Sequence, residues 1–233
     1  MKIIKLDAID STNSYLKRLL TKGILDDLTV VVSKHQTEGK GRNENIWENK
    51  ASLNLAFSIY KKFNNLDVNQ KFMLNVISSL SVFQLLKENN LNKMKIKWPN
   101  DIMTGRRKIS GILIENSIRG KLIKESVIGV GINVNQKKFD NLPNATSLLI
   151  ETGCEFSLDS LASRLAEIFR KKFLQFEKNK EGLLKNYNNH LFLKKTDSNF
   201  IGFENKKFTG KIISVNKRGE LRIKKTNNQV INY

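Results

Sequence analysis

Strand-like and helix-like segments follow one another in this chain without a regular β-α-β alternation. Short apolar runs predict strands at residues 2–9, 28–33, 53–60, 94–98, 108–115 and 123–134. Apolar residues at helical spacing predict helices at residues 15–20, 69–89, 158–177 and 182–191. This order favours an α+β fold with a mixed or antiparallel sheet flanked by helices.

The C-terminal part of the chain follows a different pattern. Alternating segments at residues 208–215, 220–224 and 229–233 are separated by turn signals at 216–219 and 226–228. They predict a small β-barrel-like unit. We therefore expect a body at residues 1–193 and a small C-terminal β domain at residues 194–233, whose third β segment is barely complete.

Composition and charge narrow the class of protein. Of 233 residues, 39% are hydrophobic, which is enough for a sizeable core. No run of membrane-spanning length, no signal-peptide pattern and only one cysteine occur, so we expect a cytoplasmic protein without a membrane partner. The two histidines, His35 and His190, lie far apart, and no zinc-ligand spacing or catalytic triad pattern occurs, so no resident metal is expected.

The chain is strongly basic, with 41 Lys and Arg against 22 Asp and Glu, a net charge of +19. The cations are scattered along the chain, as on solvated faces, and they suit a polyanionic substrate. A basic nucleic-acid-binding protein is the alternative from a different functional class. No arginine-rich arm or RNA-binding motif supports that alternative.

Two lysines flank a rigid turn near the middle of the chain. The turn has the sequence KWPND at residues 97–101, and KISG follows at residues 108–111. Proline fixes its own φ and disfavours a helical conformation in the residue before it, so Trp98 is expected to end a strand. Such a turn could hold cations and one anion at fixed spacing around a phosphate-bearing ligand. The alternative is an ordinary β-turn with its lysines in solvent.

A long polar segment at residues 35–52 predicts a loop, and it carries glycines that alternate with cations. Residues 36–47 read QTEGKGRNENIW. Glycines free backbone N–H groups to face an anion, and Lys40 and Arg42 supply charge, while Trp47 could fold over a ligand. The spacing fits neither the P-loop nor the dinucleotide fingerprint. A long loop inside a compact domain is commonly functional or mobile.

Placed in order, these motifs resemble those of the biotin protein ligases. The order is STN at 11–13, the loop at 36–47, KWPND at 97–101, KISGILIE at 108–115 and IGVGINVN at 128–135. KWPND with its lysine-glycine follower and the GxGIN string are highly characteristic of that family. The resemblance implies a biotin/lipoate ligase-like catalytic domain and a small SH3-like C-terminal β-barrel.

The resemblance also implies a two-step reaction. Biotin and ATP, with Mg²⁺, form biotinyl-5′-AMP and release pyrophosphate. A lysine of a biotin carboxyl carrier protein, from acetyl-CoA carboxylase or another biotin-dependent carboxylase, then displaces AMP. A monomer and a homodimer both remain open. A lipoate ligase or transferase on the same scaffold is the nearer alternative.

By this resemblance, biotin would contact polar residues near the N-terminus, the glycine-cation loop and residues around the second lysine. These residues are Ser11, Thr12, Asn13, Gln36, Lys40, Gly41, Arg42, Lys108 and Gly111. The first four are expected to contact the ureido ring, whose donors and acceptors need fixed partners. The alternative for residues 11–13 is a helix N-cap, and both readings hold if one residue caps while the others face the pocket.

The implied nucleotide-binding set overlaps with the biotin set. It consists of Lys40, Arg42, Trp47, Lys97, Asn100, Asp101, Gly129, Gly131 and Asn133. The implied catalytic residues are Lys108, Arg42, Lys97 and Asp101. Lys108 is expected to reach the biotin carboxylate and the α-phosphate, Lys97 to serve the phosphates, and Asp101 to orient groups around the adenylate or to help deprotonate the acceptor lysine.

The chain departs from the family pattern at three places. The family loop reads GRGRRGR before its tryptophan, whereas residues 39–45 read GKGRNEN, which bears on how the adenylate is retained. STN begins at residue 11, which leaves no room before it for the DNA-binding domain of some members, so no repressor role and no specific DNA are expected. A further glycine-acid element that closes the family's C-terminal domain is absent.

Overall fold

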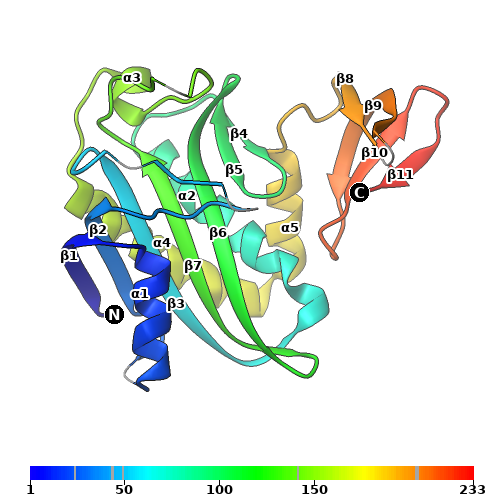
Figure 1. The fold of residues 1–233 in the computed structure, drawn as a ribbon. Coiled ribbons are helices and arrows are strands. Elements are labelled where there is room, and N and C mark those ends of the chain that lie inside the picture. Colours follow the sequence, from blue (N-terminus) through cyan, green and yellow to red (C-terminus); the bar gives the residue numbers. More distant parts are fainter. Residues whose placement is uncertain (24, 43–44, 49, 141, 203–204) are drawn as a thin grey trace.

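A seven-stranded mixed sheet forms the centre of the molecule (Figure 1). The computed structural model describes residues 1–23, 25–42, 45–48, 50–140, 142–202 and 205–233. The strands are β1 (Ile3–Ile9), β2 (Val30–Gln36), β3 (Asn54–Asp67), β4 (Met94–Lys97), β5 (Asp101–Thr104), β6 (Arg107–Arg119) and β7 (Leu122–Asn133), in the order β1-β2-β3-β7-β6-β5-β4. Only β1 and β2 run parallel; the other neighbours are antiparallel. The predicted mixed sheet is confirmed.

Helices cover both faces of this sheet. Helix α1 (Thr12–Thr21) packs on one face, where Leu16 meets Val31, Tyr60 and Val127. The long helices α2 (Phe72–Glu88) and α4 (Leu158–Lys178), with α5 (Lys180–Asn189), cover the opposite face and bury the main core. Two short helices, η1 (Val68–Gln70) and α3 (Leu148–Thr152), lie in connections. None of the helices in the described part of the chain combines the length and apolar character needed to cross a membrane.

The side chains of each strand point alternately to the two helix-covered faces of the sheet. In β2, Val30 and Val32 face the main core while Val31 faces α1, as expected from the two-residue period of a strand. Helix α2 is buried on nearly all sides, so its serines Ser78 and Ser81 bond to backbone carbonyls one turn earlier. The α1 face remains partly open, and the candidate site lies there.

The C-terminal residues form a second, four-stranded antiparallel sheet. Its strands are β8 (Asp197–Ile201), β9 (Lys207–Val215), β10 (Leu221–Lys225) and β11 (Val230–Asn232), in the order β11-β10-β9-β8. Asn188 of α5 clamps it through the backbone N and O of Val215, at 2.6 and 3.0 Å, and the Trp98 indole donates to Gly219 O at 2.9 Å. In the described residues this sheet is open, with no pairing between β8 and β11, so the expected closed barrel is not confirmed.

Three short elements escaped the sequence patterns. Strand β5 has only four residues and pairs with its neighbours directly after the turn at Pro99. Strand β8 is mostly polar. Helix α3 has five residues and ends at Gly153, whose φ of 75° suits glycine. The longer predicted elements are confirmed, although β3 and β6 extend several residues further than their apolar runs.

Candidate active site

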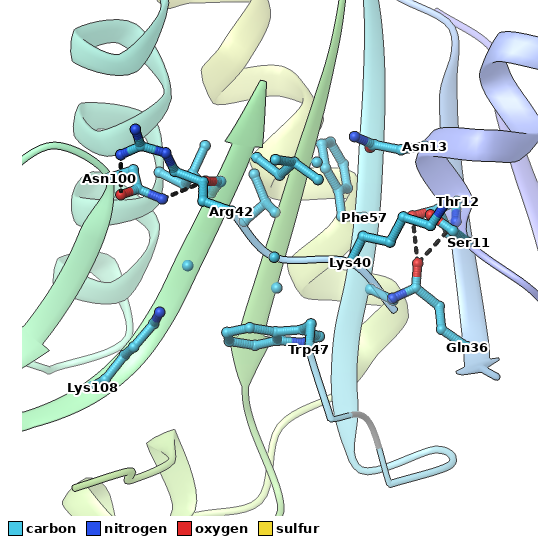
Figure 2. Close-up of a pocket in the computed structure, with 18 residues that line it drawn as sticks. Ser11, Thr12, Asn13, Gln36, Lys40, Arg42, Trp47, Phe57, Asn100 and Lys108 are labelled. Carbon is cyan, nitrogen blue, oxygen red and sulfur yellow. Dashed lines mark hydrogen bonds between the residues drawn. The ribbon is translucent and has the colours of Figure 1, made fainter. Parts of the chain in front are cut away.

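A pocket on the α1 face of the sheet collects residues from five distant parts of the chain (Figure 2). Every residue expected to bind biotin lines it, namely Ser11, Thr12, Asn13, Gln36, Lys40, Gly41, Arg42, Lys108 and Gly111. The nucleotide candidates Trp47, Asn100, Gly129 and Gly131 line it as well. We call this the inner pocket; its free volume is about 60 Å³.

The first turn of α1 forms the polar end of the inner pocket. Ser11 is the N-cap, and its hydroxyl accepts from the Ser14 backbone N–H at 3.5 Å. Thr12 and Asn13 then lie buried at the start of the helix. The Thr12 backbone N–H and hydroxyl both donate to Gln36 Oε1, at 2.8 and 2.9 Å. Capping and pocket formation therefore occur together, divided among neighbouring residues.

Two glycines of β7 make room for pocket side chains. A Cβ at Gly129 would lie 2.5 Å from Asn13 Oδ1, and one at Gly131 would lie 2.5 Å from Trp47 Nε1. Real Cβ atoms do not approach other atoms so closely, so both positions require glycine. The glycines of the IGVGIN string thus admit the Asn13 amide and the Trp47 ring against the sheet.

The loop that follows β2 closes over the inner pocket as a small hairpin. Trp47 N donates to Gly39 O at 2.9 Å, and Gly41 N donates to Asn45 O at 2.7 Å. The Trp47 ring lies against the pocket floor, and its Nε1 is buried without a hydrogen-bond partner. Asn43 and Glu44, two of the departures from the family loop, lie outside the described residues.

Cations gather at the other end of the inner pocket. Lys108 Nζ lies 2.8 Å from Asp101 Oδ1 and 5.6 Å from the centre of the Trp47 ring. Arg42 Nη1 donates to Asn100 Oδ1 at 3.3 Å, and Asn100 Nδ2 donates to Ile112 O at 2.6 Å. Figure 2 shows Lys108 and Arg42 across the pocket from Thr12 and Gln36.

A larger cavity of about 1000 Å³ adjoins this cationic end. We call it the outer cavity; Trp47 and Lys108 line both spaces, and Lys97, Asp101 and Asn133 line the outer cavity alone. The Asn133 amide donates to Thr146 O at 2.9 Å. The remaining nucleotide candidates, Lys40, Arg42, Asn100, Gly129 and Gly131, line the inner pocket and not the outer cavity. Among the described residues, no group of three or more His, Cys, Asp or Glu side chains is placed to hold a metal ion.

Sequence reasoning missed several parts of the site. Apolar walls come from Ala56, Phe57, Ile112, Leu113 and Val130, and residues of the 136–145 and 192–199 segments line the outer cavity. It also missed Ser58, which is fully buried and bonds to Thr12 and Asn13. A serine inside the apolar run at residues 53–60 was the available signal.

This arrangement suits a ligand with two different ends. The Thr12–Gln36 end offers fixed donors and acceptors to a neutral polar group. The Lys108–Arg42 end offers positive charge to anions, close to the point where the outer cavity joins. Residues 6–133 match the model of the Biotin/lipoate A/B protein ligase family.

The chain belongs to this ligase family. Among curated relatives, it is 27% identical over 179 residues to the bifunctional ligase/repressor BirA of Bacillus spizizenii, covering 75% of this chain and 54% of that protein. It is 28% identical over 169 residues to a biotin–[acetyl-CoA-carboxylase] ligase of Mycobacterium tuberculosis, covering 71% and 62%. The chain thus spans between half and two thirds of the length of these relatives.

A solved member of the family is similar along the whole chain. The biotin protein ligase from Aquifex aeolicus, in complex with biotin and ATP, superposes with a TM-score of 0.83 at 25% identity. The match covers 100% of this chain and 95% of that one, so it includes the small C-terminal sheet. The family's ligase fold therefore extends over both sheets of this protein.

Proposed function

We propose that this protein ligates biotin to a lysine of a biotin carboxyl carrier protein, with ATP as the second substrate and biotinyl-5′-AMP as the intermediate. The observation that carries the proposal is the inner pocket, polar at one end and cationic at the other, opening at Lys108 into the outer cavity. The names of two relatives support it. One is a biotin–[acetyl-CoA-carboxylase] ligase, and the other is a biotin protein ligase solved in complex with biotin and ATP.

The first step joins two anions. We place the ureido ring of biotin at Thr12, Asn13 and Gln36 and its carboxylate toward Lys108, with MgATP in the outer cavity as substrate. A carboxylate oxygen attacks the α-phosphorus, the bond from that phosphorus to the α,β-bridging oxygen breaks, and pyrophosphate leaves. Lys108, Arg42 and Lys97 offset the repulsion between the reactants and the charge that develops on the phosphoryl oxygens.

Asp101 has a positioning role in this scheme. Its carboxylate holds the Lys108 ammonium at 2.8 Å, which directs the charge to the junction of the two spaces. In the second step the acceptor amine attacks the acyl carbon, the bond to the adenylate oxygen breaks, and AMP leaves while the amine gives up a proton. The expectation that Asp101 accepts this proton stays a prediction. In the structure its Oδ1 is already paired with Lys108.

Further parts of the proposal concern the whole protein. We assign residues 1–193 to the catalytic domain and residues 194–233 to a small C-terminal domain related to SH3-like folds, which borders the outer cavity through Asp197, Asn199 and Thr209. We place the reaction in the cytoplasm, with an acetyl-CoA carboxylase carrier or another biotin carrier as acceptor.

Labelled-ligand transfer tests the function. Purified protein with MgATP should catalyse biotin-dependent exchange between ATP and pyrophosphate, and should then label a carrier domain but not a carrier whose acceptor lysine is changed to Arg. Exchange and labelling with lipoate in place of biotin would assign the protein to the lipoate branch of the family. Salt-sensitive nucleic-acid binding without any exchange would favour the binding-protein alternative.

A further inference from the structure

A chain of hydrogen bonds runs from the surface into the polar end of the inner pocket. Lys17 Nζ lies 2.7 Å from Glu115 Oε1, and Glu115 Oε2 accepts from Asn13 Nδ2 at 2.8 Å. Ser58 Oγ lies 2.6 Å from Asn13 Oδ1 and 2.7 Å from Thr12 Oγ1. Glu115 does not line the inner pocket and reaches it only through Asn13.

The two outer ends of this chain fix the orientation of its two amides. The Glu115 carboxylate, paired with Lys17, only accepts, so Asn13 must turn its Nδ2 to Glu115 and its Oδ1 to Ser58. At the other end the Thr12 backbone N–H turns the Gln36 amide oxygen toward Thr12. The Thr12 hydroxyl lies between Gln36 Oε1, at 2.9 Å, and Ser58 Oγ, at 2.7 Å, and its hydrogen can turn to either oxygen.

Asn13 therefore presents an acceptor, and no donor, to the buried corner that it forms with Thr12 and Ser58. Ser58 lies within bonding distance of both neighbours, so it can donate its one hydroxyl hydrogen to Asn13 Oδ1 while it accepts from Thr12. All three residues are at most 4% exposed. An amide oxygen has two acceptor sites, so Asn13 Oδ1 can accept from a ligand N–H group as well as from Ser58.

We propose that Glu115 is a positioning residue for biotin recognition: its carboxylate holds the Asn13 amide in the one orientation that presents an acceptor to the corner, and it thereby sets the preference for a ring with N–H donors. The inference rests on the proposed function and concerns selectivity within the same pocket. A site that needs an N–H group discriminates strongly against a ligand that lacks one.

Glu115→Gln tests the idea because it removes the constraint while keeping size and shape. A glutamine can donate to a flipped Asn13, whose Nδ2 can then donate to Ser58, which donates to Thr12. Asn13 then presents a donor to the corner in place of the acceptor. We expect E115Q to fold with a thermal midpoint close to that of the wild type and to bind biotin about 10- to 100-fold more weakly.

The decisive readout is the ratio of two dissociation constants. One ligand is biotin and the other is its cyclic carbonate analogue, in which oxygen replaces each ring N–H. We expect the wild type to prefer biotin strongly. In E115Q the ratio of the two dissociation constants should be smaller by at least about tenfold. General loosening of the pocket would weaken both ligands equally. The kcat at saturating biotin should change little, since the Lys108 end is untouched.

Two further variants complete the experiment. Asn13→Asp combined with E115Q reverses the outer hydrogen bond, because an aspartate only accepts, so the double variant should regain preference for biotin relative to E115Q. Glu125→Gln is the matched control: Glu125 accepts from Tyr60 at 3.1 Å on the neighbouring strand and lies outside the inner pocket. Its ratio should equal that of the wild type.

The role of Glu115 is overturned if E115Q keeps the wild-type ratio, if both ligands weaken together, or if E115Q fails to fold, since the flipped network must be self-sufficient. Biotin-dependent exchange by the wild type tests the proposed function separately. An inactive wild type contradicts the function, whereas an active wild type with an unchanged ratio in E115Q contradicts only the role of Glu115.

Discussion

At the scale of single residues, the site depends on a few close contacts between side chains from distant strands. Lys108 of β6 lies opposite Met103 of β5, and a register shift next to Met103 places its side chain on the same face as Asp101, two residues along β5. Gly129 and Gly131 matter through the side chains that they lack, because Asn13 and Trp47 occupy that space. Both kinds of contact predict effects on ligand binding that exceed effects on stability.

Lys108→Ala should strongly reduce the rate of adenylate formation while leaving the fold intact. Removing one preorganised positive donor from such a site lowers turnover about 100- to 1000-fold. The Lys108–Asp101 pair is partly exposed, with side chains 37% and 22% accessible, so the free energy of unfolding should change by less than about 1 kcal/mol. Exchange between ATP and pyrophosphate measures the first effect and urea unfolding the second. Lys95→Ala, on the exposed side of β4, is the control; wild-type exchange in K108A would refute the role.

Gly131→Ala should displace Trp47 from the pocket floor. The added methyl group would overlap the indole, so the ring must leave its place on the floor of the inner pocket, and biotin should bind about tenfold more weakly or worse. Trp47 and Trp98 are the two tryptophans of the chain. In a Trp98→Phe background, the emission of Trp47 should therefore shift to longer wavelength in G131A. An unchanged spectrum with unchanged affinity would contradict the packing described.

At the scale of elements, the ends of helices and strands carry the site while their middles form the core. Helix α1 presents its first turn to the pocket, and β6 and β7 present the segments around Gly111 and Gly129. On the opposite face, α2 and α5 meet where His190 stacks on Phe83 with ring centres 4.2 Å apart. This contact anchors the segment that leads from α5 to the small sheet.

His190 should make stability depend on pH just below neutrality. Burial, with help from Lys95 and Lys87, lowers the pKa of His190 below its usual 6.5. As the pH falls through 6.5 the unfolded chain takes up the proton first, so the free energy of unfolding decreases until the folded pKa is passed. Urea unfolding at pH 7.5 and 5.5 should show a smaller loss in His190→Gln than in the wild type. Equal losses in H190Q and the wild type would exclude this contribution.

At the scale of the whole molecule, the net charge of +19 acts on both stability and substrate capture. Like charges destabilise the compact state, and a cationic cavity raises the local concentration of anions. Both effects are screened by salt. Three cations, Lys97, Arg106 and Lys108, line the outer cavity together with three acids, Glu48, Asp101 and Asp197, so the net attraction for anions comes from the charge of the whole chain. The nucleotide carries more charge than biotin, so its binding should respond more strongly to salt.

Raising the salt concentration from 20 to 300 mM should therefore raise Tm and raise the KM for ATP more than the KM for biotin. The Debye length shortens over this range to less than about 10 Å, so surface charges more than this distance apart no longer interact strongly. Thermal scans and steady-state exchange measure the two trends. A KM for ATP that stays constant across the range would argue against capture by the net positive charge.

Much of the site was predictable because its chemistry is local in sequence. STN, the glycine-cation loop, KWPND and GxGIN each indicate a backbone or charge requirement that only certain residue types meet, and each motif contributes residues to the two adjoining spaces. The long apolar runs likewise predicted the main strands and helices, since burial of a face imposes its period on the sequence.

What needed the folded chain was the pairing of groups far apart in sequence. Three such contacts are the Asp101–Lys108 ion pair, the packing of Trp47 against Gly131 and the hydrogen bond from Asn13 to Glu115. They follow from strand register and loop closure, which depend on many weak contacts over the entire sheet. Short elements such as β5 and β8 carry too few residues for a period to emerge, and the division into inner pocket and outer cavity exists only once both sheets are in place. Residue types in a sequence indicate which chemistry is available. The orientation of an amide such as that of Asn13 is fixed by neighbours that only tertiary packing brings close.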